Sequence, residues 1–231
     1  MLIRLILAHA IADFPLQTNT IYNYKEKSKK GILLHVLIHF LTSYVLLFNM
    51  FNLKLLGIVS LIAIIHFFQD WFKLYLQKKH EIFNRTFAFI FDQVVHIIVV
   101  FISYYYISKM LFGFIPHNFF PVSYSDKIGL LLSLSILASF GGCVAIYFID
   151  KSILKRNITY KKEYSGLLER MLIPIIIYLK MNIIYMLLLI VIRALYYYIY
   201  NNRKEFKIIR TVNLILSPVI ALLLSIIIFY I

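Results

Sequence analysis

Apolar runs of about 20 residues recur along the whole of this 231-residue chain. Each run is long enough to cross a hydrocarbon core of roughly 30 Å as a helix. The composition agrees, because 62% of the residues are hydrophobic, only 15% are charged, and the mean hydropathy is +0.84. A soluble domain of this length cannot bury so much apolar surface. Since lipid offers no partner for backbone polar groups, the predicted fold class is an all-α, polytopic integral membrane helix bundle.

About eight transmembrane helices are predicted from the positions of these runs. The run over 165–200 is too long for one crossing, and Lys180-Met181-Asn182 supplies a turn that splits it in two. KEKSKK (25–30) reads as a basic loop, and Pro116 and Pro121 predict an irregular loop over 110–126. The expected spans are 2–18, 31–50, 53–77, 86–109, 127–149, two helices within 165–200, and 211–231.

The basic residues predict the orientation. Lys and Arg number 24 against 10 Asp and Glu, but they lie in short loops, which is the usual orientation signal of a membrane protein and excludes nucleic-acid binding. Seventeen of them fall in the loops 25–30, 73–85, 151–162 and 203–210, against four in the opposite loops. With eight helices, this bias places those four loops in the cytoplasm and both termini outside, in a multi-pass protein of the cytoplasmic membrane.

One integral membrane domain is predicted, in two halves. A four-helix core over 1–112 bears His and Asp residues, an external loop spans 113–126, and a second four-helix part spans 127–231. The pair Gly141-Gly142 suits a close helix approach. Cys143, the single cysteine, allows no internal disulfide and is interpreted as a small packing residue.

Four apolar segments of the first half each carry two His or Asp residues spaced four apart. On a helix this spacing stacks both side chains on one face. The predicted topology also brings all eight groups to one level, in the cytoplasmic-side part of the membrane. The pairs are His9 with Asp13, His35 with His39, His66 with Asp70, and Asp92 with His96.

Three interpretations of these eight residues remain open. Imidazoles and carboxylates from four helices suit one or two divalent metal ions, such as Zn²⁺, Fe²⁺ or Mn²⁺. The same groups also suit a proton or ion path, or hydrogen bonds that only join helices. Ionisable groups inside a membrane are costly and normally face the bundle interior, so we expect them to line one cavity on the cytoplasmic side.

Other polar residues are given lesser roles. Gln17, Gln69 and Gln93 flank the pairs, as supports of the ligands or as interhelical contacts. Trp71, Lys73 and Tyr75 are expected to anchor the cytoplasmic interface, while His80 and His117 lie in predicted loops and are not assigned to the site. In the second half, Glu169 is expected to pair with Arg193, with binding of an anionic headgroup as the alternative.

Several stretches resemble a known family. LILAHAIADFPLQT, GILLHVLIH, HFFQDWFK and FDQVVHII, with GLLERMLIPIIIYL further on, are similar to the uncharacterised bacterial membrane family named domain of unknown function 3307. More loosely, the His/Asp pairs resemble bacterial inner-membrane proteins described as metal-dependent hydrolases. The first resemblance implies no settled activity.

Three functions are therefore expected. The first is a metal-dependent hydrolase that acts on a lipid-linked phosphate or ester, with the bilayer as partner and source of substrate. The second is a carrier of metal ions or protons that uses the same groups as a relay. The third is a non-catalytic scaffold whose basic face binds anionic lipid or a partner protein.

Overall fold

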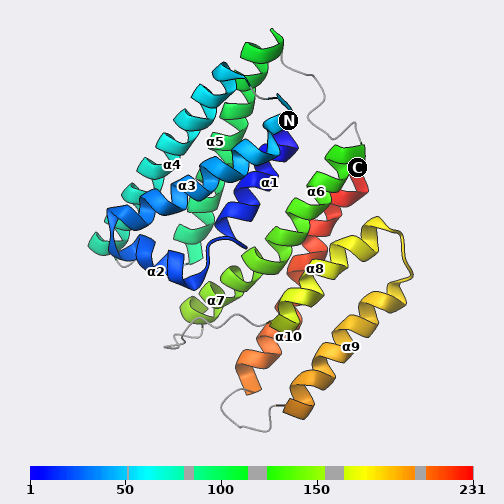
Figure 1. Ribbon diagram of the computed structural model, residues 1–231. Coiled ribbons are helices and arrows are strands. Elements are labelled where there is room, and N and C mark those ends of the chain that lie inside the picture. Colours follow the sequence, from blue (N-terminus) through cyan, green and yellow to red (C-terminus); the bar gives the residue numbers. More distant parts are fainter. Residues whose placement is uncertain (51, 81–85, 114–123, 154–163, 201–206, 231) are drawn as a thin grey trace. The chain divides into compact units, whose positions relative to one another are not determined.

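The computed structural model describes the chain except residues 51, 81–85, 114–123, 154–163, 201–206 and 231 (Figure 1). The described part is helical and contains no strand, which confirms the all-α class. It divides into two compact units, Met1–Ser133 and Leu134–Ile231. Most of the predicted loops over 113–126 and 151–162 lies outside the described residues, as does His117. The same holds for the first half of the predicted loop over 203–210, whereas its second half is wrong as a loop, because a helix begins at Lys207.

The first unit is built on four packed helices and one short connecting helix. α1 packs against α3 and α5, while α4 packs against both α3 and α5. Asn52 begins α4 by accepting a 2.7 Å hydrogen bond from the Leu55 N–H through its side chain. The elements are α1 Leu2–Asp13, α2 Asn19–Lys27, α3 Lys29–Leu46, a 3₁₀ turn Phe48–Met50, α4 Leu53–Lys79, α5 Thr86–Phe112 and the first part of α6 Tyr124–Ile136.

Four helical stretches among the described residues are long and apolar enough to cross a membrane: Lys29–Leu46, Leu53–Lys79, Phe89–Met110 and Ser125–Tyr147. Their outer faces carry exposed apolar side chains such as Phe68 and Phe72 of α4, as expected for contact with lipid. α1 has 12 residues and a length of about 18 Å, which is shorter than a hydrocarbon core. The count of eight spans stays a prediction.

The predicted basic loop over 25–30 is wrong, because helices occupy almost all of it. α2 ends at Lys27 and α3 begins at Lys29, so Ser28 alone separates them. Its hydroxyl donates to the Tyr24 carbonyl at 3.2 Å and accepts from the Gly31 N–H at 3.0 Å, which closes one helix and opens the next. The basic run therefore lies in two helices, which set the helix face on which each of its side chains lies.

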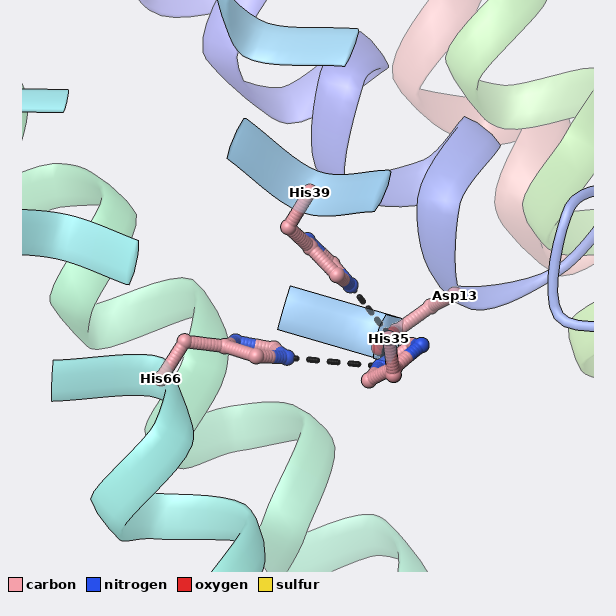
Figure 2. Close-up of side chains that lie close together, drawn as sticks. All are labelled: Asp13, His35, His39 and His66. Carbon is pink, nitrogen blue, oxygen red and sulfur yellow. Dashed lines mark hydrogen bonds and ion pairs between the residues drawn. The ribbon is translucent and has the colours of Figure 1, made fainter. Parts of the chain in front are cut away.

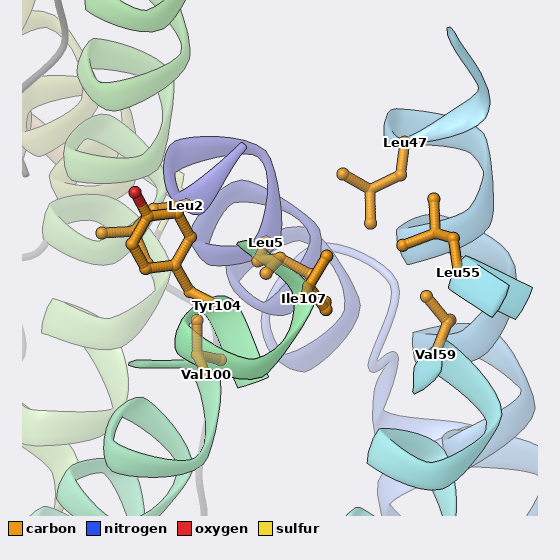
Figure 3. Packing of buried hydrophobic residues seen from close by; sticks show 8 residues of the cluster. All are labelled: Leu2, Leu5, Leu47, Leu55, Val59, Val100, Tyr104 and Ile107. Atoms are coloured by element: carbon orange, nitrogen blue, oxygen red, sulfur yellow. The ribbon is translucent and has the colours of Figure 1, made fainter. Parts of the chain in front are cut away.

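Buried apolar side chains fill the end of the first unit that lies opposite α2 (Figure 3). They come from the start of α1, the end of α3, the start of α4 and the end of α5, because these helices alternate in direction. The cluster consists of Leu2, Leu5, Leu47, Leu55, Val59, Val100, Tyr104 and Ile107. It closes one end of the four-helix core, so the polar pairs lie between this cluster and α2.

The second unit consists of the end of α6, a π-helical turn Leu137–Gly141, and the helices α7 Gly142–Ile153, α8 Tyr164–Tyr178, α9 Ile183–Tyr200 and α10 Lys207–Ser225, followed by a 3₁₀ turn Ile226–Tyr230. α8 packs against α10, α9 and α7. Lys180 adopts a left-handed backbone conformation with φ of 52° between α8 and α9. The predicted split of residues 165–200 into two helices is confirmed.

Candidate metal centre

Each His/Asp pair contributes one residue to each of two tiers across the four-helix core. α1 and α4 run toward the end that carries α2, whereas α3 and α5 run away from it (Figure 1). A spacing of four residues corresponds to about 6 Å along a helix. The tier nearer α2 contains Asp13, His35, Asp70 and Asp92, and the other contains His9, His39, His66 and His96.

The four histidines of the second tier form a closed ring, with one imidazole from each of α1, α3, α4 and α5. The ring centroids lie 5.2 Å apart between His9 and His39 and 4.0 Å apart between His39 and His66. The ring closes at 4.5 Å from His66 to His96 and 5.3 Å from His96 to His9. Four helices therefore meet at one level, as the sequence predicts.

Two imidazoles of this ring, those of His39 and His66, converge with His35 and the Asp13 carboxylate, so that three helices contribute to one group (Figure 2). Asp13 Oδ1 lies 2.8 Å from His39 Nε2 and 3.1 Å from His35 Nε2, and His35 Nε2 lies 3.4 Å from His66 Nε2. A tetrahedral ion with ligand bonds of about 2.0–2.2 Å separates its ligand atoms by about 3.3–3.6 Å. The ligand atoms of Asp13, His35, His39 and His66 all lie within 4.8 Å of one another, so this group can hold a metal ion.

A metal ion bound by all four residues explains this group better than separate hydrogen bonds between pairs of them. A neutral imidazole has one N–H and one acceptor nitrogen. If His35 Nε2 donates to Asp13, it has no proton left for His66 Nε2, although the two nitrogens face each other. Convergence on one point is what a metal ion requires, whereas hydrogen bonds between helices need only separate contacts.

A second group that can hold an ion consists of His66, Asp70 and His96. His96 Nδ1 lies 2.7 Å from the Asp92 carbonyl oxygen, which can only accept, so Nδ1 carries the proton. In the neutral ring Nε2 is then an acceptor, and this buried atom has no hydrogen-bond partner among the residues that the structure describes. His96 Nε2 therefore carries no proton and has a free lone pair, as a metal ligand must.

Two lysines that were expected elsewhere from the sequence form ion pairs with carboxylates of the tier nearer α2. Lys25 Nζ lies 2.7 Å from Asp70 Oδ2, and only 7% of the Lys25 residue surface is exposed. Lys73 Nζ donates to Asp92 Oδ2 at 2.6 Å, so Lys73 is an ion-pair partner within the cluster, which corrects its expected role as an interface anchor. Asp13 is the carboxylate whose neighbours in the cluster are imidazoles.

The cluster carries a net negative charge. Its three carboxylates and two ammonium groups sum to −1 while the histidines are neutral. An unbalanced charge at a buried position is expensive. Asp13 therefore marks the place where an added cation is favoured most.

A small cavity of about 30 Å³ lies on the side of the histidine ring that faces away from α2. That volume has room for about two water molecules. His9, His39, His66 and His96 line one side, and the remaining lining is Leu5, Phe40, Ser43, Val59, Ile62, Ala63, Gln69, Val99, Val100 and Ser103. The ring thus separates the cavity from the lysine–carboxylate pairs.

The glutamines that flank the pairs have different surroundings. Gln69 lines the cavity, and its buried Oε1 has no hydrogen-bond partner in the described part of the chain. Gln93 Nε2 donates to Asp92 Oδ2 at 3.4 Å. Gln17 is half-buried in the segment between α1 and α2.

The expected ion pair of the second unit is present. Arg193 Nη1 donates to Glu169 Oε2 at 2.7 Å, with both side chains almost completely buried, and Arg193 Nη2 donates to Asn213 Oδ1 at 3.2 Å. Arg170, which the sequence interpretation left without a role, is 1% exposed and donates to the Ser139 carbonyl at 3.2 Å and to Ser217 Oγ at 2.7 Å. These contacts join helices α8, α9 and α10 with the π-helical turn.

Of the two lysines that pair with the carboxylates, Lys73 could have been found from its spacing in the sequence. Lys73 follows Asp70 by three residues and His66 by seven, so all three share one helix face. Lys25 has no such signal, because its direction depends on α2 being a helix and on where that helix packs.

A protein-family model matches residues 1–118, which is more than half of the chain and includes α1–α5 with all eight His and Asp residues of the cluster. No curated protein and no solved structure matches the chain significantly. The chain therefore belongs to the family described as "Protein of unknown function (DUF3307)", as the resemblance of its N-terminal motifs implies.

Proposed function

We propose that this chain is a multi-pass protein of the cytoplasmic membrane that binds a divalent metal ion through Asp13, His35, His39 and His66. The observation that carries the proposal is the convergence of these four ligand atoms from α1, α3 and α4. The mixture of imidazole nitrogen and carboxylate oxygen suits Zn²⁺, Fe²⁺ or Mn²⁺. A bound ion would supply a Lewis acid that polarises a water molecule or a phosphoryl or carbonyl oxygen.

Hydrolysis of a lipid-linked phosphate or ester is the activity that the surroundings of this group support best. Two of its members, His39 and His66, border the cavity, so a small reacting group can approach the ion from that side. The cavity is too small for a whole lipid, so only the bond to be cleaved would enter it. The described residues that line it include no Asp, Glu, Lys or Arg. This favours an enzyme over a carrier, which needs polar groups that continue along a path.

The charge of the cluster favours an anionic substrate. A divalent ion changes the net charge from −1 to +1 while Lys25 and Lys73 remain paired. A buried positive charge is relieved when a negative group binds beside it. A phosphate ester satisfies this condition better than a neutral carboxylic ester, so we place phosphate first among the substrate classes.

His9 is the residue that we assign to proton transfer. It lines the cavity and belongs to neither of the two groups that can hold an ion. Asp13 lies on the same face of α1, with Oδ2 3.3 Å from His9 Nε2, so this imidazole lies beside the ion site. An imidazole placed next to an activated water is a suitable general base.

Metal analysis of the purified full-length chain tests the proposal. The detergent-solubilised protein is expected to retain about one Zn²⁺, Fe²⁺ or Mn²⁺ per chain after gel filtration. Asp13→Asn and His66→Ala should each lower the affinity for that metal by at least about tenfold. His80→Ala is the matched control, since His80 is exposed at the end of α4 and should leave the metal content unchanged.

A second measurement, of ester cleavage, tests the hydrolase assignment separately from metal binding. His9→Gln should keep the metal and lower cleavage of a chromogenic phosphate ester by about 10²–10⁴-fold, the range of general acid–base catalysis. A wild-type protein that retains no metal would end the metal proposal. A metal-loaded protein that cleaves no phosphate ester or carboxylic ester would leave the metal site in place and rule out the hydrolase.

A further inference from the structure

The outer face of α4 carries a stripe of exposed side chains that ends in a lysine. The members of the stripe follow one another at spacings of three or four residues, so they lie on one helix face. The exposed apolar members are Leu61, Ile64, Phe68, Trp71 and Tyr75, and exposed Lys79 follows four residues beyond Tyr75. Along the helix the stripe therefore changes from aliphatic to aromatic to cationic, which is the order met on passing from a hydrocarbon core to the headgroups of a membrane.

The neighbouring helix α3 adds a second lysine to this stripe. Lys29 Nζ lies 5.9 Å from the centre of the Trp71 ring, and Lys79 Nζ lies 5.0 Å from the centre of the Tyr75 ring. Both distances are those of cation–π contacts. The centres of the two rings are 6.3 Å apart. One ammonium group from each of two packed helices therefore lies against one aromatic pair at the surface.

The surroundings of this aromatic pair are basic. Only one acidic residue, Glu26, is exposed among the described residues of α2, the first turn of α3 and the last turn of α4. The exposed lysines of the same segments are Lys27, Lys29, Lys30, Lys78 and Lys79. The excess of positive charge at this end favours a negatively charged partner.

We propose that Lys29, Trp71, Tyr75 and Lys79 form a binding site for a phospholipid with a net negative headgroup. The headgroup phosphate binds the ammonium groups, and an acyl chain lies along the apolar part of the stripe. From Trp71 to Leu61 this part is about 15 Å long, which is half the thickness of a hydrocarbon core and so the depth of one leaflet. The site lies on the outer face of the helix core, so the inference requires a membrane but does not depend on the proposed metal ion.

The apolar part of the stripe favours a lipid over a soluble anion. Inorganic phosphate in water would gain only the attraction of the lysines, which salt screens at an exposed position. A phospholipid already lies beside the helix, and its acyl chain contacts Phe68 and Ile64 while its phosphate is at the level of the lysines. A zwitterionic lipid has the same acyl chains and the same phosphate, but its own cationic group opposes the lysines. The charge of the headgroup is therefore what the site selects.

Trp71 is the only tryptophan of the chain, so its fluorescence reports on this site alone. The full-length protein is placed in phosphatidylcholine vesicles that contain either brominated phosphatidylglycerol or the same amount of brominated phosphatidylcholine. Bromine on an acyl chain quenches a tryptophan that it contacts, so the quenching measures which lipid lies beside Trp71. The wild type should prefer the anionic lipid by at least about fivefold, which is the factor expected from one lysine near an anionic group.

Two double variants with the same loss of charge locate the effect. Lys29→Gln with Lys79→Gln should be quenched equally by the two lipids. Lys27→Gln with Lys30→Gln removes two exposed lysines from the same end and should keep most of the preference. Inorganic phosphate added to the wild type should leave the quenching unchanged.

Equal quenching of the wild type by the two lipids overturns the inference. An equal loss of preference in both double variants overturns it as well, because the charge of the whole end would then attract the lipid. Relief of quenching by inorganic phosphate would show a site for a soluble anion instead. A salt titration of the wild type covers the case in which a variant does not fold: the preference should fall toward one at about 1 M salt, and a preference that salt leaves unchanged contradicts the role of the lysines.

Discussion

Arg193 of α9 donates a 2.7 Å hydrogen bond to Glu169 of α8, and both side chains are almost fully buried in the second unit. Removing one partner of such a pair leaves a buried charge without its counter-charge. The same guanidinium also bonds Asn213 of α10, so three helices share this contact.

Glu169→Gln should lower the free energy of unfolding by about 3–5 kcal/mol. Arg193→Gln in the same molecule should restore part of the loss, because it removes the charge that the first change leaves uncompensated. Denaturation in detergent micelles of both single variants and the double variant measures this coupling. Strictly additive effects would mean that the two side chains do not interact.

Gly142→Ala should destabilise the second unit by about 1–3 kcal/mol. A Cβ at this position would lie 2.9 Å from Arg170 Cδ and 2.9 Å from Arg170 Nε. Arg170 has little freedom to move, since it is fully buried and donates to both Ser139 and Ser217. Thermal unfolding of the purified variant measures the loss.

Gly57→Ala is the matched control for that substitution. Among the described residues, no neighbouring atom lies within 4 Å of a Cβ at Gly57, which is an exposed position in α4. Alanine favours a helix by about 0.8–1.0 kcal/mol over glycine, so this variant should be as stable as the wild type or more stable. Equal destabilisation by both substitutions would contradict the steric explanation at Gly142.

Metal should stabilise the wild type through Asp13. An ion that binds only the folded state raises the free energy of unfolding by about 2.7 kcal/mol at a concentration of 100 times its dissociation constant. Added Zn²⁺ should therefore raise the unfolding temperature of the wild type, and a chelator should reverse the change. Asp13→Asn, whose affinity should be at least about tenfold lower, should gain no more than about 1.4 kcal/mol at the same concentration. A shift of equal size in that variant would place the ion elsewhere.

The fold class and the convergence of the eight His and Asp residues follow from sequence, because both depend on helix geometry. A spacing of four places His66 above Asp70 whatever the neighbouring helices do, and long apolar runs leave few options other than helices. The partners of the carboxylates could not be predicted in this way. Lys25 reaches Asp70 only because Ser28 joins two helices where a loop was expected, and because Gly31 lets them touch.

The ion pair of Lys73 could not be predicted from the sequence for a different reason. Its spacing from His66 and Asp70 was visible, but the usual place of a lysine near the end of a membrane helix is the water interface. The pairing with Asp92 depends on how α4 packs against α5, which no local pattern specifies. The contacts of Arg170 could not be predicted either. It donates to the Ser139 carbonyl, which lies in a π-helical turn that no sequence pattern indicates.

The orientation of the chain is the last prediction. It rests on seventeen Lys and Arg residues in the segments 25–30, 73–85, 151–162 and 203–210, against four in the segments expected on the opposite side. In a Cys143→Ala background, Ser28→Cys, Lys79→Cys, Asn157→Cys and Lys204→Cys should each resist a membrane-impermeant thiol reagent in intact cells and react after lysis. Ser28 and Lys79 both lie at the α2 end of the first unit, so these two sites must agree with each other whatever the total number of spans. Asn157 and Lys204 test the second half independently. Labelling of Asn157→Cys and Lys204→Cys in intact cells, with the first two protected, would keep the orientation of the metal cluster and overturn the count of eight helices.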